Sequence, residues 1–220
     1  QPEGGPLPGA GELPGAVRAS SAAPGAAPRP FCVYLHVPYC RVRCGYCDFN
    51  TYTNLDMGPG ASAGDFVDTL AGELALAAAA MDRAGLPRRR ARTVFLGGGT
   101  PTVLPAGDLV RMLDLVRRTW GLAPGAEVTT EANPETVDER YLATLARAGF
   151  TRVSIGMQSA VPRVLAVLDR THTPERVPLV VDWARRAGLS TSLDLIYGAP
   201  GESMGDWRRS LEAAIGIGPD

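Results

Sequence analysis

The sequence predicts an α/β domain built around a parallel β-sheet, and three observations lead to this fold class. Short β-rich segments alternate with helical patterns at spacings of roughly 25 to 40 residues. No internal repeat is evident, and the β-rich segments lack hairpin turns, which argues against an antiparallel sandwich. Five strand–helix units fit a barrel-like sheet that lacks its last part, or an open doubly wound sheet. In both, the chemistry lies at the carboxyl ends of the strands.

Five strands and five helices are expected in order along the chain. The strand segments are "FCVYLHV" at 31–37, "TVFLG" at 93–97, "EVTTEA" at 127–132, "RVSIGMQ" at 152–158 and "STSLDLIYG" at 190–198. The helical patterns cover about 65–83, 109–120, 139–149, 174–187 and 205–215. Thr136 and Glu139 form a capping-box pattern before the third helix, and Gly149 ends it. Cys32, on the first strand, is expected to be a core residue.

Composition and charge narrow the class of protein. The chain has 220 residues, 45% of them apolar, with 22 basic against 23 acidic side chains. This balance gives no indication of a nucleic-acid partner or an anionic membrane surface. No apolar run approaches the ~18 residues of a membrane span, and the first thirty residues lack a signal peptide's apolar block. We therefore expect a cytoplasmic protein whose cysteines are ligands or catalysts rather than disulfides.

The ends of the chain differ from its middle. Residues 1–30 are nearly all Gly, Ala, Pro and Ser, so we expect a disordered lead-in before one domain at 31–220. The chain begins at Gln1 and stops at "GIGPD", just after a helical pattern, so we expect a piece of a longer protein. An unfinished barrel leaves a sheet edge open, and the isolated piece is expected to be marginally stable.

Three of the four cysteines lie in one loop, "HVPYCRVRCGYCDFNTYT", directly after the first strand. Cys40, Cys44 and Cys47 follow the pattern C-x3-C-x2-C. Three thiolates on a short loop can hold three irons of a [4Fe–4S] cluster and leave the fourth open to a ligand. A structural zinc site would need a fourth ligand, and His36 is the only nearby imidazole. Three unrelated thiols are the remaining interpretation.

Other side chains of the loop and of the strand ends fit a cofactor site. Arg41 and Arg43 could offset negative charge on a cluster, and the loop aromatics Tyr39, Tyr46 and Phe49 could restrict water. Polar residues and glycines also follow the later strands, at Gly97 to Gly99, Glu131, Gln158 and Asp194. Such groups at corresponding strand ends can converge on one pocket.

The extended pattern resembles a known family. The segments "YLHVPYCRVRCGYCDF", "LGGGTPT", "EANPE", "RVSIGMQS", "LDRTH" and "LDLIYGAPGES" occur in the order typical of the oxygen-independent coproporphyrinogen III oxidase-like group of radical S-adenosylmethionine (SAM) enzymes. The match runs from about 32 to 210. It implies a partial (βα)6 barrel, truncated here after about five βα units, with a [4Fe–4S] cluster on Cys40, Cys44 and Cys47. It also implies that SAM binds the open iron and is cleaved to a 5′-deoxyadenosyl radical.

The resemblance further implies a set of SAM contacts. These are Tyr34, Tyr46, Gly98, Gly99, Thr100, Glu131, Gln158, Arg170 and Asp194. The glycine turn would meet the methionyl part of SAM, Glu131 its ribose or amino group, and Arg170 its carboxylate. The turn is not a phosphate-binding Walker loop, because the Lys-Ser/Thr pair is missing. His172 is not expected to be a ligand.

Phe49 discriminates within the group. The oxidases resemble C-x3-C-x2-C-x-C, whereas the "CDF" form here is typical of HemW-type haem chaperones. That resemblance implies that haem is a further ligand. It also implies two partner proteins, a haem-accepting respiratory protein and an electron donor. Two alternatives remain. One is a porphyrinogen oxidase, and the other is a protein whose cluster is purely structural or redox-sensing. Whether the protein is an enzyme therefore stays open. Neither His36 nor His172 is an evident haem ligand.

Overall fold

The computed structural model describes residues 29–220, so nearly all of the expected lead-in at 1–30 lies outside the described residues. The strands are β1 (Cys32–Val37), β2 (Ala91–Gly98), β3 (Leu122–Ala132), β4 (Arg152–Gln158) and β5 (Ser190–Leu195). The helices are α2 (Phe66–Arg83), α3 (Ala106–Thr119), α4 (Glu139–Ala148), α5 (Pro162–Val167), α6 (Arg176–Arg186) and α7 (Met204–Ile217). Two 3-10 turns, η2 (Pro101–Val103) and η3 (Pro134–Thr136), follow β2 and β3.

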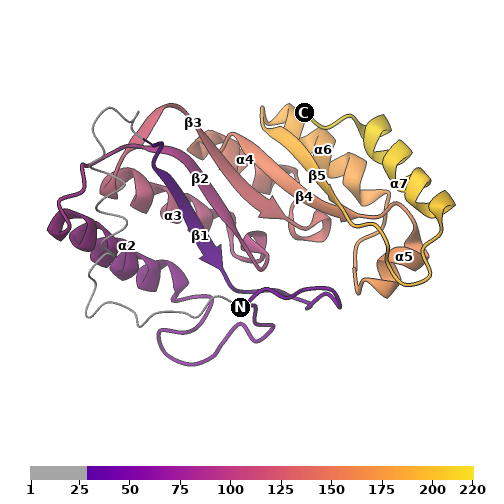
Figure 1. The fold of residues 1–220 in the computed structure, drawn as a ribbon, viewed down its shortest axis with the longest axis horizontal. Helices are drawn as coiled ribbons and strands as arrows, with labels where there is room; N and C mark the ends of the chain where they lie inside the picture. The colour runs from indigo at the N-terminus through magenta and orange to yellow at the C-terminus, as the bar shows by residue number, and fades with distance from the viewer. Residues whose placement is uncertain (1–28) are drawn as a thin grey trace.

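The five strands form one parallel sheet in the order β1-β2-β3-β4-β5 (Figure 1). Each strand therefore lies beside its neighbour in the sequence, and every carboxyl end is at the same edge. The register places Val37 beside Gly98 and Gly156 beside Asp194. Within the described residues, β1 and β5 each pair on one side only. The predicted α/β fold with five βα units is confirmed.

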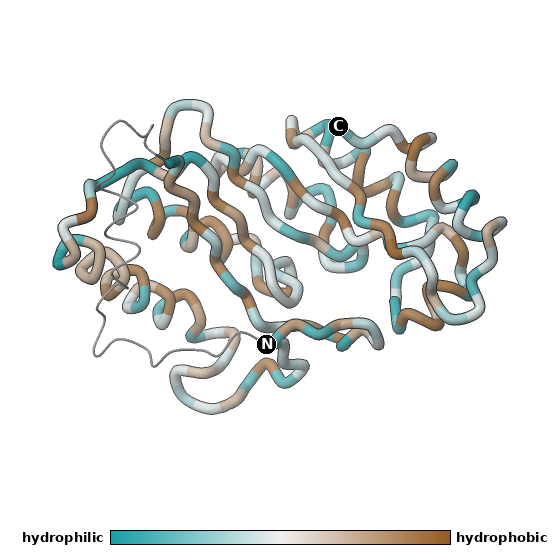
Figure 2. The backbone as a smooth tube through the Cα atoms, viewed as in Figure 1, coloured by the Kyte–Doolittle hydropathy of each residue, from teal (hydrophilic) through white to brown (hydrophobic). Residues whose placement is uncertain are grey.

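The helices settle the choice between a barrel-like and a doubly wound sheet. Helices α2, α3, α4 and α6 contact one another in that order and share a core with one face of the sheet. Hydrophobic and hydrophilic residues alternate along these helices, as Figure 2 shows. Five residues were predicted as the periodic face of this helix. Leu109, Met112, Leu113 and Val116 are fully buried, whereas Trp120 is the C-cap of α3 and is only partly buried. The opposite face of the sheet carries polar side chains, among them Glu131, Ser154 and Asp194, which line a cavity.

Strand β1 shows how the pleat assigns residues to the two faces. Val33, Leu35 and Val37 are buried against the helices, whereas Tyr34 is exposed on the other face. Successive side chains of a strand point to opposite faces, so Cys32 shares the face of Tyr34 and is exposed. The prediction that Cys32 lies in the core is therefore wrong.

The start of one helix and the presence of another differ from the prediction. Helix α4 is capped by Asp138, whose carboxylate accepts the Tyr141 backbone N–H at 2.7 Å. Thr136 ends the preceding 3-10 turn instead, and its hydroxyl donates to the Asn133 carbonyl. Gly149 ends α4 in the left-handed conformation, as predicted. Helix α5 was not predicted, because its six residues are too short for a helical period to be recognised.

Among the helices of residues 29–220, none is long and apolar enough to cross a membrane.

Candidate functional site

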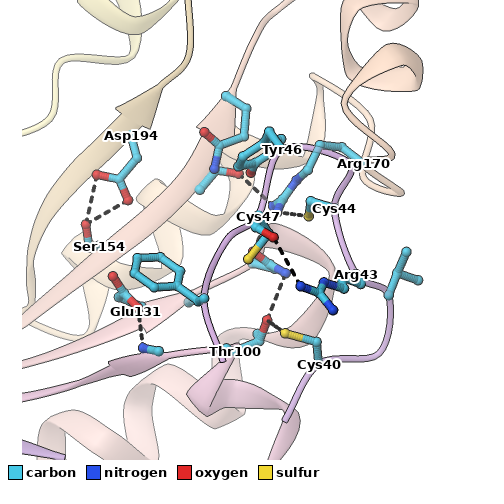
Figure 3. A pocket seen from close by; sticks show the side chains of 18 residues that line it. Cys40, Arg43, Cys44, Tyr46, Cys47, Thr100, Glu131, Ser154, Arg170 and Asp194 are labelled. Carbon is cyan, nitrogen blue, oxygen red and sulfur yellow. Dashed lines mark hydrogen bonds between the residues drawn. The ribbon is translucent and has the colours of Figure 1, made fainter. Parts of the chain in front are cut away.

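A cavity of about 190 Å³ lies at the carboxyl ends of the strands, between the sheet and the loop that follows β1 (Figure 3). Eleven of the twelve predicted site residues line it: Cys40, Cys44, Tyr46, Cys47, Gly98, Gly99, Thr100, Glu131, Gln158, Arg170 and Asp194. Positions from six separate segments of the chain therefore line one cavity. Tyr34 does not line it, and its hydroxyl instead donates to His36 Nδ1 at 3.0 Å.

The cysteine loop is anchored at both ends beside β1. The Tyr52 N–H donates to the Pro38 carbonyl at 2.7 Å, and the Cys40 N–H donates to the Tyr52 carbonyl at 3.0 Å. Between these bonds the chain turns back on itself, and the Cys47 N–H donates to the Cys44 carbonyl at 3.1 Å. The loop thus carries all three thiols to one side of the cavity.

Each of two thiols already has a polar neighbour from another element. Cys40 is buried, and its Sγ accepts from Thr100 Oγ1 at 3.7 Å. Burial raises the pKa of the Cys40 thiol, and the Thr100 hydrogen bond opposes that rise. The Sγ of Cys44 accepts from Arg170 Nη1 at 3.4 Å. Both contacts are of the kind that stabilises a thiolate.

The donor set fits an iron–sulfur cluster better than zinc. Three thiols face one cavity, and soft sulfur ligands of this kind suit a cluster. The obvious fourth zinc ligand, His36, is engaged elsewhere, because Nδ1 accepts from Tyr34 and Nε2 donates to the Asn50 carbonyl at 3.1 Å. No three His, Cys, Asp or Glu side chains of residues 29–220 are gathered as a ready-made metal site. The three thiols line the same cavity, but they do not form a compact metal-binding cluster.

The glycine turn after β2 lets the loop approach the sheet closely. A Cβ on Gly99 would lie 2.6 Å from the Tyr39 carbonyl oxygen and 3.0 Å from Cys40 Sγ. Gly98 has φ +113°, and a Cβ there would meet the His36 ring at 2.6 Å. The Gly98 N–H donates to Glu131 Oε2 at 3.0 Å. Only glycine fits at both positions.

Two partly buried carboxylates, from β3 and β5, line the opposite wall. Burial raises the pKa of Glu131, nearby Asp194 raises it further, and the Gly98 bond opposes the rise. Burial likewise raises the pKa of Asp194, against a hydrogen bond from Ser154 Oγ at 3.1 Å. A cationic or hydroxyl-bearing ligand would relieve both groups. This wall therefore suits an ammonium or a ribose.

Arg170 connects the carboxylate side of the cavity to the thiols. Its Nη2 donates to Asn133 Oδ1 at 2.7 Å and to the Gly156 carbonyl at 3.0 Å, while Nη1 contacts Cys44. Its Nε is buried without a hydrogen-bond partner among the described residues. A guanidinium held this way presents a fixed fork to a carboxylate ligand.

Two polar side chains of the cavity had no predicted role. Asn133 joins Arg170 to Thr100, because its Nδ2 donates to Thr100 Oγ1 at 3.2 Å. Ser154 donates to Asp194 and also bonds Ser192 Oγ at 2.8 Å. Asn133 lies within "EANPE", so the motif pointed to the segment. No signal in the sequence singled out Ser154.

Gln158 lines the cavity, whereas His172 does not. Gln158 ends β4 with φ +60°, a backbone conformation that is uncommon for a residue with a side chain. His172 is buried behind the cavity, and its Nε2 donates to the Met157 carbonyl at 3.1 Å. Burial and the nearby Arg170 charge lower the pKa of His172. His172 does not line the cavity, and its expected lack of a ligand role stays a prediction.

Comparison with known proteins identifies the family. The Radical SAM superfamily model matches residues 34–214, and the chain belongs to that superfamily. Superfamily membership implies a [4Fe–4S] cluster and SAM as cofactors.

Individual relatives narrow the resemblance. The chain is similar to "Heme chaperone HemW" of Mycobacterium tuberculosis (strain CDC 1551 / Oshkosh), 51% identical over 201 residues, which cover 90% of this chain and 50% of the relative. It is 37% identical over 191 residues to the HemW of Escherichia coli (strain K12), covering 86% and 48%. A solved structure, coproporphyrinogen III oxidase (HemN) from Escherichia coli, matches with a TM-score of 0.79 at 27% identity over 94% of this chain and 46% of that one. The predicted resemblance is confirmed, and the chain spans about half the length of these relatives.

Proposed function

We propose that the protein containing this chain is a haem chaperone on a radical SAM scaffold, which binds haem in the cytoplasm and transfers it to a haem-requiring respiratory protein. The observation that carries the proposal is Phe49. It stands where the resembling oxidases have a further cysteine, and it is exposed at the cavity beside the three thiols. The HemW name of the relatives at 51% and 37% identity supports the same choice.

Cys40, Cys44 and Cys47 would hold the [4Fe–4S] cluster through three of its irons. When bound, the cluster and SAM supply one-electron reductive cleavage of a sulfonium, for which an external electron donor is required. The residues around the thiols tune that site. Thr100 donates to the first thiol, Arg170 neutralises charge at the second, and the aromatic ring of Tyr46 limits access of water.

SAM would lie between the thiols and the sheet, and each part of it meets a matching group. The carboxylates of Glu131 and Asp194 accept hydrogen bonds from its ammonium and ribose hydroxyls. The backbone at Gly98, Gly99 and Thr100 lets the methionyl part approach closely, and Arg170 binds its carboxylate. The side chains of Tyr46 and Gln158 complete the cavity wall. Tyr34 would affect SAM binding indirectly, through His36, to which its hydroxyl is hydrogen-bonded.

An oxidase is the second candidate, in which the same radical chemistry decarboxylates a porphyrinogen propionate. The observation that favours it is the similarity to the solved HemN structure at a TM-score of 0.79. Both candidates need the cluster and SAM, so they differ in what happens to the tetrapyrrole.

One experiment separates the two. The whole protein is reconstituted anaerobically with iron, sulfide, SAM and a reductant, and is offered coproporphyrinogen III in one arm. In the other arm it is titrated with haem and then mixed with an apo haem protein. We expect stoichiometric haem binding and transfer, with no vinyl product. Vinyl formation with multiple turnovers would overturn the chaperone proposal in favour of the oxidase.

A further inference from the structure

Arg170, to which the carboxylate of SAM is assigned, is carried by a short turn after α5. Its backbone N–H donates to the Leu165 carbonyl at 2.9 Å, and the residue before it, Asp169, has φ +53°. This left-handed conformation is unfavourable for a residue with a side chain. The backbones of Thr171 and His172 make no backbone hydrogen bond within residues 29–220. Side-chain contacts therefore contribute to holding this turn.

One carboxylate, that of Glu135, meets both residues that follow Arg170. Its Oε1 accepts from Thr171 Oγ1 at 3.0 Å, and its Oε2 faces His172 Nδ1 at 3.9 Å. Both Oε2 and Nδ1 are buried, and neither has a hydrogen-bond partner within residues 29–220. Neither side chain lines the cofactor cavity. Glu135 therefore lies outside the cavity, yet it is placed to fix the turn that carries Arg170.

The segment that contains Glu135 is itself held in place. Glu135 lies in η3, and Arg176 of α6 donates to two carbonyl groups of this segment, one on each side of Glu135, at 3.2 and 2.9 Å. Asn133, just before η3, accepts from Arg170 Nη2 at 2.7 Å. The segment thus contacts Arg170 directly at its guanidinium and, through Glu135, at the two residues that follow it.

We propose that Glu135 is a positioning residue, which holds the turn after α5 so that Arg170 meets the carboxylate of SAM. This inference rests on the proposed function, which assigns that contact to Arg170. A residue that acts through Arg170 affects only ligands that carry the carboxylate. A purely electrostatic role would have the opposite sign, because a negative charge near the site repels an anionic group and its removal would tighten binding.

Hydrogen-bond chemistry identifies a substitution that should preserve the positioning. His172 Nε2 donates to the Met157 carbonyl at 3.1 Å, so Nδ1 of the neutral imidazole is an acceptor. In Glu135→Gln the amide oxygen accepts from Thr171, and the amide nitrogen donates to Nδ1. Glu135→Gln therefore keeps the contacts without the charge, whereas Glu135→Ala loses both.

The test measures the affinity of the whole, cluster-loaded protein for SAM and for decarboxylated SAM by equilibrium dialysis, at iron contents determined for each variant. We expect Glu135→Ala to weaken SAM binding about tenfold and to leave the binding of decarboxylated SAM unchanged. Glu135→Gln is expected to bind both ligands with wild-type affinity.

Two further variants test the contact from its other side and control for surface charge. Thr171→Val removes the hydroxyl that donates to Glu135 and is expected to weaken SAM binding alone, by about threefold to tenfold. Glu139→Ala removes a carboxylate that is 60% exposed and lies 3.5 Å from Arg186. It should leave both affinities unchanged.

The outcomes distinguish this inference from the proposed function. A Glu135→Ala protein with wild-type affinity for SAM would overturn the inference, and so would one that binds both ligands more weakly by the same factor. A Glu135→Gln protein as weak as Glu135→Ala would overturn it too, because charge rather than geometry would then matter. The proposed function stands in all three cases. A wild type that binds SAM no more tightly than decarboxylated SAM would overturn the contact assigned to Arg170, and this inference with it.

Discussion

The glycine turn after β2 offers a sharp perturbation, because Gly99 and Gly72 have opposite surroundings. A Cβ on Gly99 would be 2.6 Å from the Tyr39 carbonyl oxygen and 3.0 Å from Cys40 Sγ. A backbone atom cannot rotate away as a side chain can, so Gly99→Ala must push the cysteine loop off the sheet. A Cβ on Gly72, in the middle of α2, would meet nothing within 4 Å.

The two substitutions are therefore expected to change stability in opposite directions. Overpacking of this kind costs about 1–3 kcal/mol. It also strains two backbone bonds at the turn, Gly99 N–H to the Val37 carbonyl at 2.7 Å and Thr100 N–H to the Tyr39 carbonyl at 2.8 Å. We expect Gly99→Ala to lower the free energy of unfolding by about 2–3 kcal/mol. Gly72→Ala should raise it by about 1 kcal/mol, since alanine favours the helix.

Urea unfolding of the metal-free protein measures the stability, and iron and sulfide analysis after anaerobic reconstitution measures the site. Because Cys40 follows Tyr39 directly, a displaced loop is expected to reduce the iron content of Gly99→Ala to well below that of the wild type. Gly72→Ala should keep the wild-type content. A Gly99→Ala protein with unchanged urea midpoint and full iron content would refute the argument that close approach at this turn positions the thiols.

Three further predictions follow from the site. Burial and Asp194 raise the pKa of Glu131, so its charged form costs stability above the unfolded value of about 4.3. Glu131→Gln should therefore raise the urea midpoint at pH 7 but not at pH 4. The same variant should bind SAM about tenfold or more weakly in equilibrium dialysis. Unchanged SAM affinity would contradict the assigned contact. Burial and Arg170 lower the pKa of His172, so its stabilising neutral form is lost as pH falls below about 6.5, and an NMR titration should give a value under 6.5. Cys40→Ala should lose the cluster and reductive SAM cleavage, and a variant that kept both would exclude this thiol as a ligand.

Local patterns predicted most of the fold because each segment's pattern agrees with its place in the packed structure. The segment "RVSIGMQ" matches β4 residue for residue, and the periodic residues of α3 are its buried face. The errors have local physical causes. Cys32 follows the exposed face of β1 because the pleat has a period of two. Thr136 is used by a 3-10 turn, so the cap of α4 passes to Asp138.

The site was predictable as a set of motifs but not as a network. The spacing of the cysteines and the order of the segments brought eleven positions to one cavity. The contact of Arg170 with Asn133 joins residues 37 positions apart, and its contact with Cys44 spans 126 positions. Such contacts depend on how the loops meet above the sheet, which no local pattern encodes. The error at Tyr34 has a different cause, because its hydroxyl bonds His36 two residues along the same strand and the side chain does not reach the cavity.

The most direct test of the cofactor assignment is electron paramagnetic resonance of the reduced, reconstituted protein with SAM labelled at its methionyl nitrogen or carboxyl carbon. Three thiol ligands and an open iron predict a [4Fe–4S] signal that changes on addition of SAM and shows hyperfine coupling to the label. A zinc-containing protein without such a signal would contradict the assignment. So would a cluster whose spectrum is unaffected by SAM, because its fourth iron would then not be open.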